Sequence, residues 1–257
     1  MSPLTITIKD WSAWAPGLHT PEDWQQWAAG QKTIGGDTQP DVKAIPAMLR
    51  RRLSPLGKMA LATALPLIHD AEQNIPSVLV SRHGDLNRTL ALLTDLANGE
   101  DLSPTHFSLS VHNAIGGLLS ITRKDTSSMT ALACGAEDIS TALLEAQAIL
   151  TEQNCKQVLC LIYDEPIPDV YRNQNIVLPC HPYATAFLLE DASKSTSPGA
   201  IRLQLELRRR GTSASGDLNH GSPQTLTFLR WILSASRTEN TLELPGQRNC
   251  WHWSLAC

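Results

Sequence analysis

Apolar runs of strand length alternate with segments of helical spacing along most of this chain. The runs "SVLVSR" (77–82), "QVLCLIYDE" (157–165) and "HPYATAFLLED" (181–191) are nearly continuous, which is typical of interior strands covered on both faces. A helix is predicted after Gly135, where apolar residues recur at spacings of three and four: Ile139, Ala142, Leu143, Ala146, Ile149 and Leu150. This alternation predicts an α/β layered fold with at least some parallel strands.

The remaining elements are predicted from shorter patterns. Further strands are expected at 5–8, 106–111, 201–210 and 249–256, and further helices at 20–30, within 45–69, at 86–99 and at 223–236. Thr20 is the predicted N-cap of the first helix, with Pro21 at its first position and Asp23 three residues after the cap. Gly116 and Gly117 in "NAIGGLLSI" predict a close approach of two backbones.

The density of elements changes after Asp191. The chain there has a polar loop, one alternating strand, the long polar stretch "GTSASGDLNHGSP", one helix and one closing strand. We therefore expect a nearly complete unit over residues 1–191 and an abbreviated portion over 192–257 that packs on the same fold.

Composition excludes several classes of function. The 257 residues are 42% hydrophobic with a net charge of −4, which argues against wholesale nucleic-acid binding. The triplets Arg50–Arg52 and Arg208–Arg210 are interpreted as solvated faces, with docking of an acidic protein as the weaker alternative. We find neither a leader-like start nor an apolar run long enough for a bilayer, so we expect no membrane span and a cytoplasmic location.

The six cysteines do not predict a metal site. They lie at 134, 155, 160, 180, 250 and 257 without CxxC pairs, and free, mostly buried thiols are expected. Cys180-His181 would need two more ligands that the sequence does not supply. No metal and no cofactor is predicted.

The stretch "MTALACGAEDI", Met129 to Ile139, reads as a short strand that turns through Gly135 into a helix. A thiol placed at such a turn gains from the positive end of the helix dipole, which lowers its pKa and favours the thiolate that an acyl transferase needs. Leu132, in the middle of the stretch, has neither a lone pair nor a proton to offer. It supplies only apolar volume.

Four stretches, taken in order, resemble the N-terminal half of the β-ketoacyl synthases, the condensing enzymes of fatty-acid and polyketide synthesis. They are "RRLSPLGKMALATAL", "FSLSVHNAIGGLLSI", "TALACGAEDISTALLEA" and "HPYATAFLLED". The resemblance covers roughly residues 1–191, and the ordered set is more specific than any one motif. It implies a thiolase-like α/β/α layered fold with a nearly complete N-terminal half and a truncated C-terminal half.

The same resemblance places Leu132 where the family has its nucleophilic cysteine. Thr130 matches the family turn, and Cys134 falls on its small serine. The family's His-Gly-Thr-Gly-Thr and Gly-His motifs, whose histidines activate the thioester, are not found, and neither His220 nor His252 has their context. The resemblance therefore implies a non-catalytic chain length factor that forms a heterodimer with an active ketosynthase and helps shape its acyl tunnel. It is most similar to the short aryl polyene type, which meets an acyl carrier protein through the complex.

We expect eight residues to lie at or near the shared face, in packing, tunnel-lining or positioning roles rather than catalytic ones: Phe107, His112, Asn113, Gly116, Gly117, Thr130, Leu132 and Cys134. Two alternatives stay open. Cys134 could be a shifted nucleophile of an acyltransferase or condensing enzyme, or the chain could be a non-enzymatic binding protein on a thiolase-like frame.

Overall fold

The computed structural model describes residues 3–68, 74–171, 179–191, 197–209, 222–234 and 240–256. The strands are β1 (Leu4–Trp14), β2 (Ser77–Val80), β3 (Met129–Leu132), β4 (Gln157–Asp164), β5 (Tyr183–Glu190), β6 (Ile201–Arg209), β7 (Thr241–Pro245) and β8 (Asn249–Leu255). The α-helices are α1 (Pro21–Ala28), α2 (Ala47–Arg50), α3 (Pro55–Ala64), α4 (Leu86–Ala97), α5 (Pro104–Ser108), α6 (Ala114–Arg123), α7 (Asp138–Glu152) and α8 (Gln224–Leu233). Two short 3-10 helices are η1 (Leu65–Leu67) and η2 (Asp169–Tyr171).

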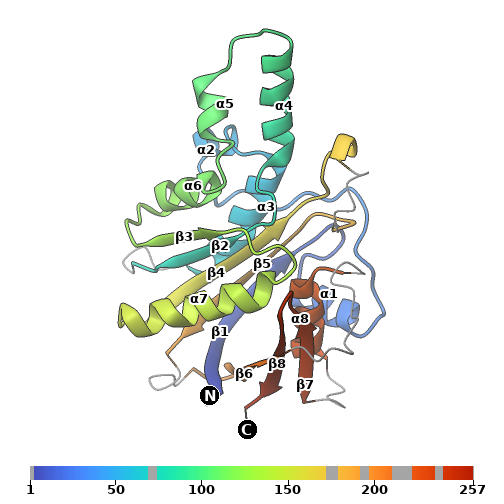
Figure 1. Ribbon diagram of the computed structural model, residues 1–257, viewed down its shortest axis with the longest axis vertical. Coiled ribbons are helices and arrows are strands. Elements are labelled where there is room, and N and C mark those ends of the chain that lie inside the picture. The colour runs from blue at the N-terminus through green and yellow to red at the C-terminus, as the bar shows by residue number, and fades with distance from the viewer. Residues whose placement is uncertain are drawn as a thin grey trace.

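All of these strands form one mixed sheet in the order β3-β2-β4-β5-β1-β6-β8-β7 (Figure 1). β2 lies between β3 and β4 and is parallel to both, whereas β4 with β5, β5 with β1 and every later pair are antiparallel. The predicted α/β class with some parallel strands is confirmed. β3, the strand with Leu132, lies at one edge of the sheet.

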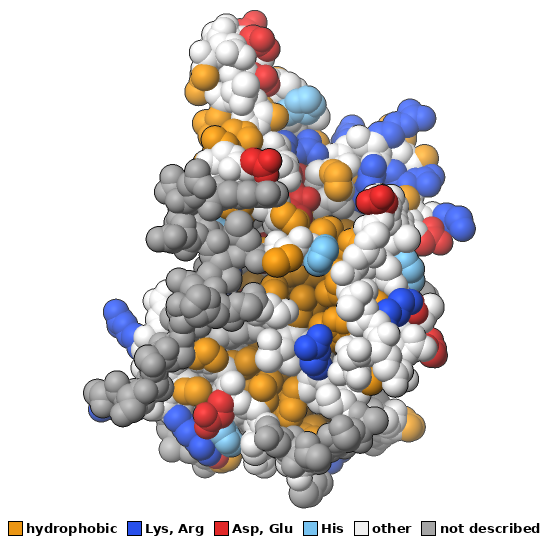
Figure 2. All heavy atoms as spheres, turned by 90° about the vertical axis from the view of Figure 1, so that its right-hand side faces the viewer, with side chains coloured by type: hydrophobic (Ala, Val, Ile, Leu, Met, Phe, Trp, Pro, Cys, Tyr) orange, Lys and Arg blue, Asp and Glu red, His pale blue; other side chains and the backbone are white. Residues whose placement is uncertain are grey.

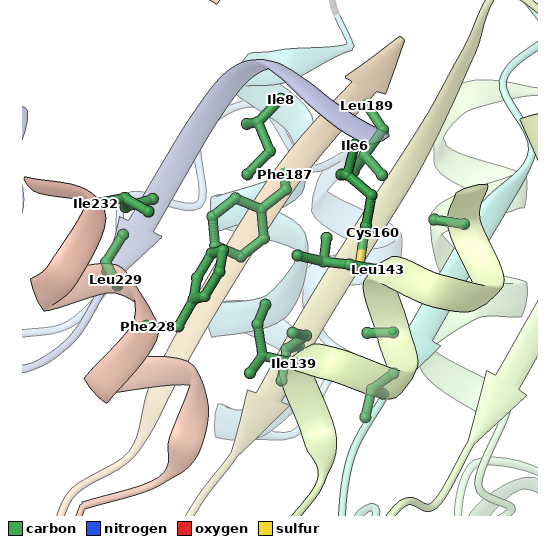
Figure 3. Packing of buried hydrophobic residues seen from close by; sticks show 14 of the residues in the cluster. Ile6, Ile8, Ile139, Leu143, Cys160, Phe187, Leu189, Phe228, Leu229 and Ile232 are labelled. Carbon is green, nitrogen blue, oxygen red and sulfur yellow. The ribbon is translucent and has the colours of Figure 1, made fainter. Parts of the chain in front are cut away.

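Helices cover both faces of the sheet and separate two hydrophobic cores. α3 and α6 pack on one face, around residues such as Leu61, Leu119 and Leu161. α1, α7 and α8 cover the other face (Figure 1). Figure 3 shows Ile139 and Leu143 of α7 and Phe228 of α8 converging on Phe187 of β5. The rings of Phe187 and Phe228 meet edge to face, with centroids 6.0 Å apart, so the C-terminal helix completes the core that α7 begins.

The strongest local patterns of the sequence are confirmed. Thr20 accepts a hydrogen bond from Asp23 N, and the carboxylate of Asp23 accepts from Thr20 N, which forms the predicted capping box. All six residues of the predicted apolar stripe of α7 are buried. Gly135 has φ of +60° in the turn that leads into this helix, a conformation that favours glycine.

The predicted strand over residues 106–111 is wrong. The segment begins in α5, where the Ser103 hydroxyl caps the helix by accepting from His106 N and Pro104 follows at the first position. The polar positions of the alternating pattern are serines whose hydroxyls bond to the local backbone rather than facing solvent from a strand. Ser108 Oγ donates to Thr105 O, and Ser110 Oγ donates to Phe107 O.

Three smaller differences concern strand lengths and cysteines. β1 extends to Trp14, far beyond the predicted end at residue 8, and β7 was not predicted. Of the five described cysteines, all free, only Cys160 is fully buried, and Cys180 is exposed. The expectation of mostly buried thiols was therefore wrong.

The C-terminal portion continues the same sheet. β6 pairs with β1, and β8 pairs with both β6 and β7. A division at residue 191 stays a prediction. Within the described residues, we find no helix long and apolar enough to cross a bilayer, and no group of three or more histidine, cysteine, aspartate or glutamate side chains that could hold a metal ion.

Candidate functional site

The carboxyl ends of three parallel strands meet at one end of the sheet. β2 leads there into Ser81 and Arg82, β3 leads into the turn at Gly135, and β4 ends at Asp164. In open α/β sheets this is the position where ligands and reacting groups gather. The turn that the sequence singled out therefore lies in the expected place for chemistry.

A hydrogen-bond network ties these three strand ends together. Asp164 Oδ1 accepts from Ser81 Oγ at 2.8 Å and from Arg82 N at 2.9 Å. Arg82 Nε donates to Gly135 O at 3.0 Å. The turn between β3 and α7 is thus held by a side chain from β2, which is itself anchored on β4.

Two buried carboxyl groups lie around this network. Asp164 is 7% exposed and Asp138 is 4% exposed. Burial raises the pKa of Asp164 to about 7 and that of Asp138 to about 6, against the lowering effect of their hydrogen bonds and of Arg82. The Tyr183 hydroxyl donates to Asp138 Oδ2 at 3.4 Å. Both groups therefore titrate well above an ordinary aspartate.

The first turn of α7 is also fastened to the C-terminal strands. Trp251 Nε1 donates to Glu137 Oε2 at 2.6 Å, and Gln247 N donates to Glu137 Oε1 at 3.0 Å. One step further along the helix, Trp253 Nε1 donates to Ser140 Oγ at 3.2 Å. The positive end of this helix dipole therefore meets the protein's own carboxylates.

Leu132 sits at the end of β3 and is half-buried. It packs against the hydrophobic core beneath α7, which includes Val80, Ile139 and Leu143, while its carbonyl accepts from Ser81 N at 3.2 Å. The side chain fills space at the turn and offers no atom for acyl transfer.

Cys134 has the wrong electrostatic surroundings for a nucleophile. Burial, followed by the charge of Asp138, raises the pKa of its thiol to about 11, and the hydrogen bond with Thr141 lowers it only in part. A reactive cysteine requires the opposite shift, toward the thiolate at neutral pH. The geometry therefore disfavours the shifted-nucleophile alternative.

Helix α6 carries the two predicted glycines, and only one makes a close approach within the chain. A Cβ added at Gly116 would collide with Met129 Sδ and come within 3.2 Å of Leu79 Cδ2. A Cβ at Gly117 would have nothing within 4 Å. Gly116 thus lies close to side chains of β3 and β2 rather than to a backbone, and Gly117 has no such neighbour, so the predicted close approach of two backbones is not seen within the described residues of this chain.

His112 and Asn113 precede α6 in different settings. His112 Nε2 lies 2.9 Å from Ser81 O, so this histidine bridges the start of α6 to the strand end beside Asp164. Asn113 is the exposed N-cap and makes no side-chain capping hydrogen bond. Neither residue is placed as a general base next to a nucleophile.

Phe107 belongs to a separate, exposed apolar surface. We call this the α4–α6 surface; its residues are Leu93, Leu96, Leu102, Phe107, Val111 and Ile121, each between 39% and 60% exposed. Figure 1 shows α4 and α5 projecting from the end of the molecule where β3 forms the sheet edge, with α6 between them and the sheet. Exposed apolar surface of this kind marks an interaction site more often than a free surface.

The structure brings some of the eight predicted residues together and separates others. Thr130, Leu132 and Cys134 follow one another through the turn, and His112 reaches the neighbouring strand end. Phe107 lies apart on α5. Sequence reasoning missed Arg82, Asp138 and Asp164, although Arg82 and Asp164 come at the ends of predicted interior strands, where polar residues are a usable signal.

A family assignment follows from comparison with known proteins. The family model described as beta-ketoacyl synthase, N-terminal domain, matches residues 24–254. This chain belongs to the β-ketoacyl synthase family. Its thiolase-like layered fold agrees with that membership. Among curated protein sequences, none matches this chain.

Solved structures of the family refine the comparison. One chain of the ketosynthase ApeO in complex with its chain length factor ApeC, from Xenorhabdus doucetiae, is 31% identical, with a TM-score of 0.76 over 98% of this chain and 99% of that one. The ishigamide ketosynthase/chain length factor matches at 17% identity and a TM-score of 0.62, covering 80% of this chain and 68% of that one. A β-ketoacyl synthase from Burkholderia phymatum matches at 13% identity and a TM-score of 0.58, covering 82% of this chain and 65% of that one. The last two matches show the shared fold.

Proposed function

We propose that this chain is a non-catalytic chain length factor that forms a heterodimer with an active ketosynthase and helps shape its acyl tunnel. The observation that carries the proposal is Leu132 at the strand-to-helix turn, where the family places its cysteine. The carboxyl groups of Glu137 and Asp138 in the first helical turn add to it, because negative charge there opposes formation of a thiolate.

The comparisons support the same role through chain length. The match to the ApeO–ApeC structure spans nearly the whole of both chains, whereas the synthase from B. phymatum extends well beyond the matched part. This supports a correspondence between our chain and one member of the ApeO–ApeC pair. The product class that we propose is an aryl polyene, with chain elongation carried out by the partner on an acyl carrier protein.

The open edge of β3 and the α4–α6 surface are the proposed docking face. β3 pairs only on its β2 side among the described strands, so its other edge keeps backbone groups available. Gly117 on α6 is half-buried with nothing within 4 Å of an added Cβ, and it would allow a partner backbone to approach closely. A ketosynthase related to this chain by a two-fold axis would need such a face for its own stability. That need would explain why the chain keeps the ketosynthase fold without the nucleophile.

Co-expression with a ketosynthase from the same gene cluster tests the proposal. We expect a stable one-to-one complex in size measurement, product formation by the complex, and none by this chain alone. Condensation of malonyl-derived thioesters by the isolated chain would overturn the non-catalytic role. Failure of the two proteins to co-purify would instead favour the binding-protein alternative.

A further inference from the structure

A pocket of about 480 Å³ opens on the side of the molecule where α1 lies, away from the turn at Leu132. It is formed by the end of α1, the residues after it, α8 and the segment before β5. The described residues that line it are Trp27, Ala28, Ala29, Gly30, Lys32, Thr33, Ile34, His181, Ser222 and Arg230. They include two cations and a histidine but no carboxylate. Figure 2 views the molecule from the side on which α1 lies in Figure 1.

Arg230 is held in place by an aromatic ring rather than by an acid. Its guanidinium carbon lies 4.3 Å from the centre of the Trp27 ring, and no carboxylate of the described residues lies within ion-pair distance of it. Stacking uses the flat face of a guanidinium and leaves the N–H groups at its edge available. This exposed arginine is thus pre-oriented, and its side-chain N–H donors have no acceptor among the described residues.

Lys32 supplies a second cation of fixed position. Its Nζ donates to Asp23 Oδ1 at 2.6 Å, which leaves the ammonium group further N–H donors. Asp23 also accepts from the backbone N–H groups of His19 and Thr20. The hydrogen bond from Lys32 has the largest effect on the pKa of Asp23. Together with the two backbone hydrogen bonds it holds this pKa well below its usual range. Asp23 therefore offsets the charge of Lys32, and no ion pair joins it to Arg230, whose charge stays uncompensated among the described residues.

We propose that this pocket binds an organic phosphate through Arg230 and Lys32. A guanidinium fork and an ammonium group are the side chains that bind phosphate most often, and the hydroxyls of Thr33 and Ser222 line the same space. The pocket is much larger than an inorganic anion, and its wall includes Ile34 and Ala28. Room for an apolar body beside the charged group is typical of a small-molecule site. This inference does not depend on the proposed function.

Calorimetric titration of the full chain with inorganic pyrophosphate tests the site. We expect saturable binding, and we expect Arg230→Gln to weaken it by about tenfold, because hydrogen bonds to a charged group are lost. The matched control is Arg208→Gln: Arg208 is an exposed arginine on β6 that already pairs with Glu206, and its loss should leave the affinity within about twofold of the wild type. Circular dichroism confirms that both variants are folded.

The nature of the anion is tested in the same experiment. Sodium acetate at matched ionic strength should bind far more weakly than pyrophosphate, because a monocarboxylate has fewer acceptor oxygens and less charge. Absence of saturable pyrophosphate binding would overturn the proposal. So would an Arg230→Gln variant that binds as tightly as the wild type, or acetate that competes on equal terms.

Discussion

The indole N–H of Trp251 donates a hydrogen bond to Glu137 Oε2 at 2.6 Å, across 114 residues of sequence. It joins the last strand of the sheet to the residue that opens α7. This contact fastens the C-terminal strands onto the start of α7, the helix that follows the turn at Gly135.

Trp251→Phe should destabilise the protein by about 1 kcal/mol, because Glu137 would lose a donor in a partly buried setting. Urea unfolding followed by circular dichroism measures the change. Glu137→Gln is the comparison that keeps the indole bond: its amide oxygen can still accept from Trp251, but its NH2 group cannot accept from Gln247 N, so it should lose that second hydrogen bond instead. Equal stability of Trp251→Phe and the wild type would show that the contact contributes nothing.

Gly116→Ala should destabilise the fold by about 1–3 kcal/mol, because the new methyl group would collide with Met129 and crowd Leu79. Gly117→Ala, one residue along the same helix, is the control. It meets nothing within 4 Å and should stabilise the isolated chain by about 0.5–1 kcal/mol through helix propensity. Thermal unfolding of the pair separates packing from propensity, and a neutral Gly116→Ala would contradict the close approach.

The buried carboxyl of Asp164 predicts a pH dependence of stability. Its pKa rises from 3.8 to about 7 on folding, so the folded state holds this proton more tightly than the unfolded state. Protonated Asp164 therefore adds to the unfolding free energy below about pH 4, and this stabilisation is lost as the pH rises to about 7. Asp164→Asn keeps an oxygen that can accept from Ser81 and Arg82. The unfolding free energy of this variant should therefore fall less between about pH 4 and 7 than that of the wild type. A pH profile of stability parallel to that of the wild type would contradict the raised pKa of Asp164.

Phe107→Asp should weaken the proposed heterodimer by about tenfold or more, because a carboxylate would be desolvated at an apolar contact. Phe107 is 59% exposed, and Leu207 on β6 is 56% exposed but lies outside the α4–α6 surface. Leu207→Asp is therefore a matched control and should leave association unchanged. Binding of each variant to the ketosynthase is measured by calorimetry. If both variants bind like the wild type, the docking face lies elsewhere.

Leu132→Cys should not create a condensing enzyme, because the activating histidine motifs are not found in the sequence and Glu137 and Asp138 disfavour a thiolate at the turn. The purified variant is assayed with malonyl and acyl thioesters, with Leu132→Ala as the control for altered packing. Condensation by the cysteine variant in the absence of a partner would refute this expectation.

Local residue patterns were enough to predict much of the fold. The apolar runs of β4 and β5, the stripe of α7 and the capping box at Thr20 are decided by neighbours within a few residues. The inert Leu132 at the turn could likewise be recognised from the order of motifs. These features depend on periodicity and on residue type, which a sequence displays directly.

Other features were decided only by contacts between distant segments. The stretch 106–111 is an exception: it alternates like a strand, yet the local cap formed by Ser103 and Pro104 starts α5, and the alternation outweighed that signal in the prediction. The Asp164 network, the Glu137–Trp251 contact and the cationic pocket at Arg230 each join segments far apart in the chain. Burial sets the pKa of Asp164, and burial is a property of the packed molecule. The sequence by itself therefore determined most of the helices and strands and the presence of Leu132 at the turn, whereas the tertiary structure decided which side chains meet, because those contacts depend on how the sheet and its helices pack.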